Sequence, residues 1–272
     1  MHAASRDSLA AARERLDQLV DRSDPEVLGR VADELFAVVD LLDREPTLRR
    51  ALSDSSVGED DRARLLDRVL GRRLDRATAD LMAGVVRSRW STPAELTDAI
   101  DLIAQQAALA VAERGGMLDD VEDQIFRFGR ILDAQPQLRA LLADPRGTPD
   151  RRVQLLDTLI GDRVNSTTER LLARTVRAPR GRNLEVAIER LVELAAERRE
   201  RYVAYVTAPA PLSAAHEARL AATLTRIYGR AMDLQVDVDP EVLGGLVIRV
   251  KDEVIDGSVA RRLDEARHRL GS

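Results

Sequence analysis

Cysteine is absent from this chain of 272 residues, and aromatic residues make up only 3% of it. Without cysteine, the chain can form no disulfide, no thiol nucleophile and no thiolate metal site. No apolar run approaches the roughly 18–20 residues that a membrane-spanning helix needs. The start of the chain also lacks the apolar core of a signal peptide, and it carries acidic residues that a transit peptide avoids. We therefore expect a cytoplasmic protein that does not anchor itself in a bilayer.

Long blocks of basic residues are missing as well. The 42 basic and 47 acidic residues alternate along the chain, and the net charge is −5. A nucleic-acid-binding surface needs clustered basic residues, so no nucleic-acid partner is expected. Apolar residues make up 44% of the chain and charged residues 33%, and Ala, Leu and Arg are abundant. This composition is typical of a mostly helical protein.

The sequence contains a duplication. When the chain is shifted by 90 positions, residues 31–87 align with residues 121–177 without a gap, and 22 of the 57 pairs are identical. "LLDREPTLRRAL" aligns with "ILDAQPQLRALL", and Phe36 aligns with Phe126. Farther on, the register slips by two residues, so that "LTDAIDLI" aligns with "LEVAIERL". A repeat of this length indicates a duplicated domain.

Both copies show the period of amphipathic helices. Apolar residues recur on one helical face in each copy: Val27, Val31, Leu35, Val38 and Leu42 in the first, and Met117, Val121, Ile125, Phe128 and Leu132 in the second. Thr92-Pro93 predicts the start of a long helix, and Glu95 would complete a capping box with Thr92. Gly115-Gly116 predicts its end. We therefore expect one helical bundle over residues 1–114 and a second, its duplicate, over residues 115–200.

The period changes from 3.6 to 2 after about residue 201. "AMDLQVDVD" alternates strictly between apolar and polar residues, and "RYVAYVTAPAPLS" and "LVIRV" also predict strands. Helices are predicted from Ser213 to about Tyr228 and over "SVARRLDEARHRL" at the end. The predicted fold class is thus mainly α with a small α/β C-terminal domain: two tandem helical bundles, followed over residues 201–272 by a small sheet with two helices.

No pattern in the sequence predicts an active site. Gly244-Gly245 precedes a strand instead of a helix and lacks the following Lys-Ser or Lys-Thr, so it does not predict a phosphate-binding loop. The three histidines have no metal-ligand spacing, and no nucleophile elbow occurs. We expect no catalytic residue, no bound cofactor and no metal. The glycines are interpreted as shaping the small sheet.

Two sets of residues remain candidates for contact with a partner. "RTVRAPRGR" is a basic cluster that fits either an acidic partner or a solvated loop; it contains Arg174, Arg177, Arg180 and Arg182. A second set fits either a groove for a partner helix or an ordinary helical core. It consists of Leu9, Leu16, Leu19, Leu96, Ile100 and Ile103.

"VDVDPEVLGGLVIRVKDEVIDGSVARRLDEARHRL" resembles the C-terminal signature of the delta subunit of bacterial F-type ATP synthase, the counterpart of the mitochondrial oligomycin-sensitivity-conferring protein. The residues that match this signature are Asp239, Pro240, Gly244, Gly245, Ile248, Arg249, Asp256, Gly257 and Ser258. The segment over residues 128–161 is similar to the family's N-terminal six-helix bundle. The first copy departs from the usual pattern of one bundle and resembles long actinobacterial delta chains.

The resemblance implies a non-catalytic subunit of the peripheral stalk, the stator. The helical part would bind the N-terminal helix of an alpha subunit, and the C-terminal domain would bind the C-terminal region of the b subunit. The protein would lie on the cytoplasmic face of the cell membrane and touch the membrane only through the complex. The second copy would keep the usual alpha contact, and the first would extend the reach over the catalytic head. The alternative is a helical-repeat adaptor or RNA-binding regulator that uses the Arg-rich segment 174–182.

Overall fold

The structure is a computed structural model, and it describes residues 1–180, 183–200, 203–228, 232–240, 242, 244–250 and 253–257. These residues form twelve α-helices and a four-stranded sheet of mixed direction. The predicted fold class, mainly α with a small α/β part at the C-terminal end, is confirmed. The chain divides into two compact units, Met1–Ala195 and Ala196–Ser272.

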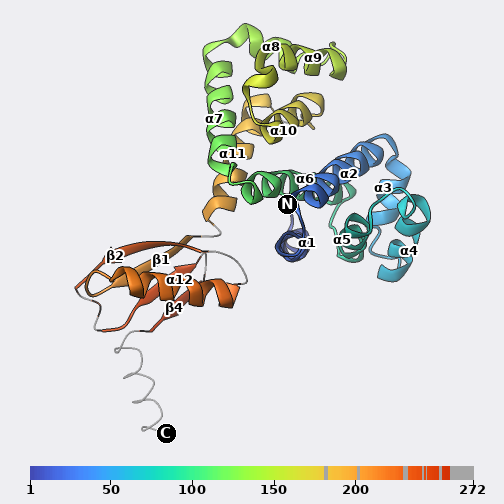
Figure 1. The fold of residues 1–272 in the computed structure, drawn as a ribbon. Coiled ribbons are helices and arrows are strands. Elements are labelled where there is room, and N and C mark those ends of the chain that lie inside the picture. The colour runs from blue at the N-terminus through green and yellow to red at the C-terminus, as the bar shows by residue number, and fades with distance from the viewer. Residues whose placement is uncertain are drawn as a thin grey trace. The chain divides into compact units, whose positions relative to one another are not determined.

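The first unit is entirely helical (Figure 1). Its helices are α1 (Ala3–Asp21), α2 (Pro25–Arg44), α3 (Pro46–Ser53), α4 (Glu59–Leu70), α5 (Arg76–Arg87), α6 (Pro93–Arg114), α7 (Leu118–Ala134), α8 (Pro136–Ala143), α9 (Pro149–Ile160) and α10 (Ser166–Arg177), with a short 3-10 helix, η1 (Gly161–Arg163). α11 (Leu184–Glu200) begins in this unit. The long helix predicted from Thr92-Pro93 has the observed bounds of α6.

The duplication is visible helix by helix. α8, α9 and α10 begin and end 90 positions after α3, α4 and α5. The polar contacts that start α5 are also repeated, because Glu34 accepts a hydrogen bond from the Asp75 amide at 2.9 Å and Gln124 accepts one from the Asn165 amide at 2.8 Å. In both copies a side chain of one helix, α2 or α7, therefore satisfies a backbone donor at the N-cap of another, α5 or α10.

A buried arginine also occurs at the same position in each copy. Arg62 on α4 is 3% exposed and donates to the backbone oxygens of Val86 and Arg87 at 2.8 Å each, at the C-terminal end of α5. Arg152 on α9 donates to the oxygen of Arg177 at 3.2 Å, at the end of α10. Carbonyls at the C-terminal end of a helix have no partner in their own helix. Each arginine therefore caps the C-terminal end of the helix beside it, α5 or α10.

One hydrophobic core runs through both copies. α6 lies between the helices of the first copy and those of the second (Figure 1). Thirteen of the 22 residues of α6 are buried, on all sides of the helix. α6 packs along α2 of the first copy, and it also packs against α10 of the second copy as α1 packs against α5. A helix that is apolar all round needs such complete burial. α6 therefore serves both repeats, as the last helix of the first and as the counterpart of α1 in the second.

The start of α6 differs from the sequence prediction in one respect. The Thr92 hydroxyl accepts a hydrogen bond from the Glu95 amide at 3.2 Å, as expected for an N-cap. The Glu95 carboxylate does not complete a capping box. It instead accepts hydrogen bonds from the Ser5 hydroxyl at 2.7 Å and from the His2 amide at 2.8 Å. This carboxylate is used to hold the start of α1, which lies over the cap in the folded structure.

The second unit contains β1 (Val203–Ala208), α12 (Ala214–Tyr228), β2 (Asp233–Val238), β3 (Val247–Val250) and β4 (Glu253–Asp256). The strand order is β2-β1-β3-β4; β1 and β2 are parallel, and the other pairs are antiparallel. A parallel pair needs a crossover, and α12 supplies it. The small core consists of Ala204, Val206, Leu224, Met232, Ile248 and Val250.

Part of the prediction for this unit lies outside the described residues. This holds for the helix expected over "SVARRLDEARHRL", for Ser258 and, in the first unit, for Arg182. Among the described residues, no helix is both long enough and apolar enough for a membrane span.

Candidate functional site

The residues predicted as a groove for a partner helix lie inside the helical unit. Five of them are at most 5% exposed, and Leu9 is partly buried against the same core: the five are Leu16, Leu19, Leu96, Ile100 and Ile103. They belong to the hydrophobic core of the helical unit, which is the core alternative left open by the sequence. As folded, they offer no open surface to a partner.

The basic cluster is divided between internal contacts and solvent. Arg174 on α10 is 7% exposed, and its guanidinium forms an ion pair with Asp40 of α2. Its Nε lies 3.4 Å from Asp101 Oδ1 of α6, and its Cζ lies 5.3 Å from the centre of the Phe36 ring. Arg174 thus joins the second repeat to two helices of the first, and Phe36 lies under a cation.

Arg180 makes a second connection of the same kind. Its Nη1 lies 2.6 Å from Asp43 of α2, and its Nη2 lies 3.2 Å from Asp98 of α6. Arg177 is different, since it is exposed and pairs with the exposed Asp150 of its own repeat at 2.9 Å. Two of the three described arginines are therefore neutralised within the chain, which removes the basic patch on which the RNA-binding alternative rested.

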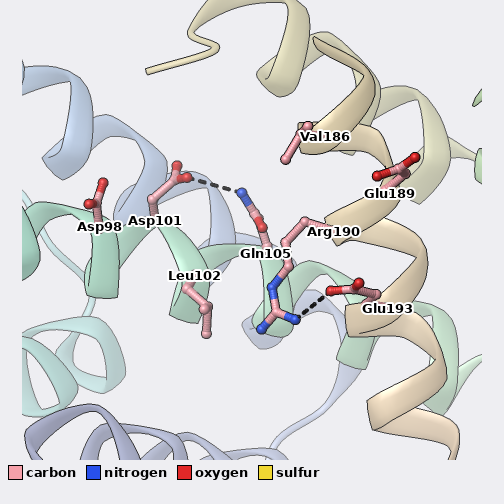
Figure 2. Close-up of a pocket in the computed structure, with 8 residues that line it drawn as sticks. All are labelled: Asp98, Asp101, Leu102, Gln105, Val186, Glu189, Arg190 and Glu193. Atoms are coloured by element: carbon pink, nitrogen blue, oxygen red, sulfur yellow. Dashed lines mark hydrogen bonds and ion pairs between the residues drawn. The ribbon is translucent and has the colours of Figure 1, made fainter. Parts of the chain in front are cut away.

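An acidic pocket of about 270 Å³ lies between α6 and α11. Figure 2 shows its eight lining residues: Asp98, Asp101, Leu102, Gln105, Val186, Glu189, Arg190 and Glu193. Gln105 donates to Asp101 at 3.0 Å, and Arg190 donates to Glu193 at 2.8 Å (Figure 2). Asp98 and Asp101 are also the partners of Arg180 and Arg174. These carboxylates thus serve the contact between the repeats.

A more apolar groove lies between α11 and α7. It has a volume of about 210 Å³ and is lined by Phe126, Gly129, Arg130, Leu132, Asp133, Glu185, Ile188, Glu189 and Val192. Of the apolar lining residues, Phe126 is 54% exposed, whereas Ile188 is only 2% exposed. An exposed aromatic side chain at a groove with an apolar lining is typical of a protein–protein contact.

Sequence reasoning missed this groove. A signal was available, because Phe126 lies off the apolar face that Val121, Ile125 and Phe128 form on α7. The same holds for Phe36 on α2, yet Phe36 is only 8% exposed. The pattern along one helix therefore does not distinguish the two phenylalanines, and only the neighbour that covers Phe36 does.

The residues of the C-terminal signature shape the sheet of the second unit. Gly244 and Gly245 have φ angles of 63° and 87°, a backbone region that favours glycine, and they lead into β3. The Gly257 amide donates to the Leu246 oxygen at 2.8 Å, and a Cβ on Gly257 would lie 3.2 Å from that oxygen. The glycine pair precedes a strand, so it does not form the phosphate-binding geometry of a helix N-terminus.

Other members of the signature pack or pair in the same sheet. The Asp239 amide donates to the Ala208 oxygen at 2.9 Å and continues the pairing of β1 with β2. Ile248 is buried in the small core, and the Arg249 guanidinium lies 5.3 Å from the centre of the Tyr205 ring. Within the described part of the chain, no group of three or more His, Asp or Glu side chains could hold a metal ion.

Comparison with known proteins finds a matching family model and relatives that cover the whole chain. The family model described as ATP synthase delta (OSCP) subunit matches residues 104–270, from the middle of α6 to near the end of the chain. An ATP synthase subunit delta of Streptomyces avermitilis is 51% identical over 271 residues, covering 100% of this chain and 99% of the relative. The corresponding protein of Streptomyces coelicolor is 50% identical over 272 residues, with the same coverage. A solved chain of the Toxoplasma gondii mitochondrial ATP synthase hexamer covers 62% of this chain at 18% identity and a TM-score of 0.33, values too low to support an argument.

The actinobacterial likeness extends over the first repeat, whereas the general family model begins in α6. The family model thus covers the second half of α6, the second repeat and the C-terminal unit, and the helices before α6 lie outside it. The chain belongs to the ATP synthase delta (OSCP) subunit family, and it is a non-catalytic stator component of the F-type ATP synthase.

Proposed function

We propose that this subunit links the catalytic head of the ATP synthase to its peripheral stalk and resists the torque of the rotor. The helical unit binds the N-terminal helix of one or more alpha subunits. The C-terminal unit binds the C-terminal region of the b subunit. The protein lies on the cytoplasmic face of the cell membrane and reaches the membrane only through the complex.

The observation that carries this proposal is the continuity of the helical unit. Both repeats share one hydrophobic core through α6, and Arg174 and Arg180 add ion pairs across their contact. Close-packed interiors have low compressibility and transmit strain. A helical unit of this construction holds the alpha-subunit helices that it binds with little internal movement, which is part of the mechanical task of a stator.

The proposal is tested by titrating the full-length protein with a synthetic peptide of the alpha-subunit N-terminal helix in a calorimeter. Affinity and stoichiometry are read together, and a peptide of the same composition in scrambled order is the control. We expect saturable binding at one site, or at two sites if the duplication doubles the contact with the head. Absence of binding to a protein with an intact thermal transition would overturn the alpha-subunit part of the proposal.

The b-subunit part is tested separately with a peptide of the b C-terminal region. We expect it to bind the full-length protein with the alpha peptide already present, because the two peptides use different units. Competition between the two peptides would contradict this assignment.

A further inference from the structure

The contact between the two repeats is of the head-to-tail kind. α2 and α6 of the first repeat receive α10 of the second: Arg170 Nε lies 3.3 Å from Asp33 Oδ1, and Arg174 lies over Phe36. A head-to-tail contact uses a different surface on each partner, so it leaves one copy of each surface uncovered at the two ends. In the second repeat, the surface equivalent to α2 and α6 is formed by α7 and α11.

This equivalent surface is the apolar groove between α7 and α11. Phe126 stands where Phe36 stands in the first repeat, and with the two-residue slip Ile188 corresponds to Ile100. Phe36 is 8% exposed because α10 covers it, whereas Phe126 is 54% exposed. The same structural position is thus covered by a helix in one repeat and uncovered in the other.

The substitutions between the two surfaces indicate what the uncovered one accepts. Val186 replaces Asp98, and Arg130 replaces Asp40, so two carboxylates that pair with arginines in the first repeat are absent. Asp133 and Glu189 remain at the positions of Asp43 and Asp101. The surface has become more apolar while keeping part of its acidic character.

The charges that remain on the groove are mostly balanced. Arg130 and Asp133 lie 3.7 Å apart, and Glu185 pairs with Arg139 of α8. For Glu189, the described part of the chain offers no ion-pair partner. The groove therefore fits a helix with an apolar face against Phe126 and Ile188 and with one basic side chain at Glu189.

We propose that the groove between α7 and α11 is the docking site of such an amphipathic helix, held in the manner in which α10 is held by α2 and α6. This inference rests on the proposed function, and on that basis the occupant is the N-terminal helix of an alpha subunit. Exposed Phe126 is the apolar anchor, and Glu189 fixes the register.

The test uses the full-length protein, the alpha peptide and three variants. Phe126→Asp places a charge in the groove, and Glu189→Gln removes the charge that fixes the register; both side chains are exposed enough for the fold to tolerate the change. Val69→Asp on α4 is the matched control, since Val69 is an apolar helix residue that is 39% exposed in the first repeat. We expect each groove variant to weaken peptide binding at least tenfold, and the control to leave it unchanged. Thermal melting checks that all three variants are folded.

Other results overturn the inference in distinguishable ways. If the wild type binds the peptide and the groove variants bind it equally well, the alpha helix docks elsewhere, and only the site is wrong. If the folded wild type does not bind, both the inference and the alpha part of the proposed function fail. If the wild type sediments as a dimer and Phe126→Asp as a monomer, the groove holds a second copy of the chain instead.

A label provides a second readout. The chain contains no cysteine, so Arg130→Cys carries a single fluorophore inside the groove and Val69→Cys carries one outside it. We expect the alpha peptide to change the emission of the first and not of the second. Equal responses, or a response only at position 69, would contradict docking in the groove.

Discussion

At the scale of single residues, Arg174 shows how a charge on the second repeat depends on carboxylates of the first. The guanidinium and its partner Asp101 are 6% and 8% exposed. Removing one member of a buried pair leaves the other charged and without its partner, which costs more than the pair itself contributes. A residue of this kind stabilises the fold only as long as its partners remain.

We therefore expect Arg174→Ala to lower the free energy of unfolding by about 3–5 kcal/mol. Arg177→Ala, three residues away in the same basic cluster, removes an exposed pair and should cost less than about 1 kcal/mol. Urea unfolding followed by circular dichroism measures both. Similar small losses for the two variants would show that Arg174 does not lock the repeats together.

Glu95 predicts a dependence of stability on pH. Burial raises the pKa of this carboxyl, but the hydrogen bonds from Ser5 and His2 outweigh burial and hold the pKa below the ordinary glutamate value. A carboxyl with a lowered pKa in the folded state contributes stability above its unfolded pKa, and this contribution is lost as the pH falls through its folded pKa.

The wild type should accordingly be more stable than Glu95→Gln above about pH 5. The difference should shrink toward zero as the pH is lowered further. Melting temperatures of both proteins between neutral and acidic pH provide the comparison. A difference that stays constant over this interval would mean that the charge of Glu95 is not what holds α1.

At the scale of elements, the end of α6 depends on one of two adjacent glycines. Gly116 has φ 68°, and its amide donates to the Glu113 oxygen, while the Met117 amide donates to the Ala112 oxygen at 2.8 Å. This is the hydrogen-bond pattern of a helix that ends with a left-handed residue. Gly115 has a right-handed backbone, and a Cβ there would meet no atom closer than 3.5 Å.

Alanine at these two positions should thus have different effects. Gly116→Ala forces a side chain into the left-handed region and should destabilise the helical unit by about 1 kcal/mol. Gly115→Ala should be neutral or slightly stabilising, because alanine favours the helix. Chemical denaturation of both variants tests the pair, and equal effects would contradict the assignment of the strained position to residue 116.

At the scale of the whole molecule, α6 determines which part of the chain forms a folded unit. A truncated chain of residues 93–272 keeps α6, against which α10 packs. A chain of residues 118–272 lacks α6 and therefore this contact. We expect the first to unfold cooperatively, although at a lower temperature than the full chain because α2 no longer covers α6. We expect the second to lack a cooperative transition in its helical part.

Thermal melts followed by far-ultraviolet circular dichroism, at matched concentration, distinguish the two truncated chains. Cooperative unfolding of residues 118–272 with full helix content would show that the second repeat folds without α6. The helix would then belong to the first repeat alone.

The sequence by itself determined the helices, their order and the repeat. Thr92 and Pro93 start α6 where the chain predicted it, since capping and a fixed proline φ act within one turn. The alternation in "DLQVDV" likewise predicts the strand β2. Gly244 and Gly245 of the signature have positive φ angles and lead into β3. These features depend on neighbours a few positions apart, so the chain encodes them locally. Membership in the delta family followed from the same signature.

Only the tertiary structure decided what those helices cover. Phe36 and Phe126 are identical residues in aligned positions, yet one is buried and the other forms an open groove. The difference comes from Arg174, which is 134 positions from its partner Asp40. In the same way, Glu95 left its predicted capping box because α1 lies over it. Burial and pairing of this kind depend on which distant surface is packed against a helix, and the period of the helix itself does not contain that information.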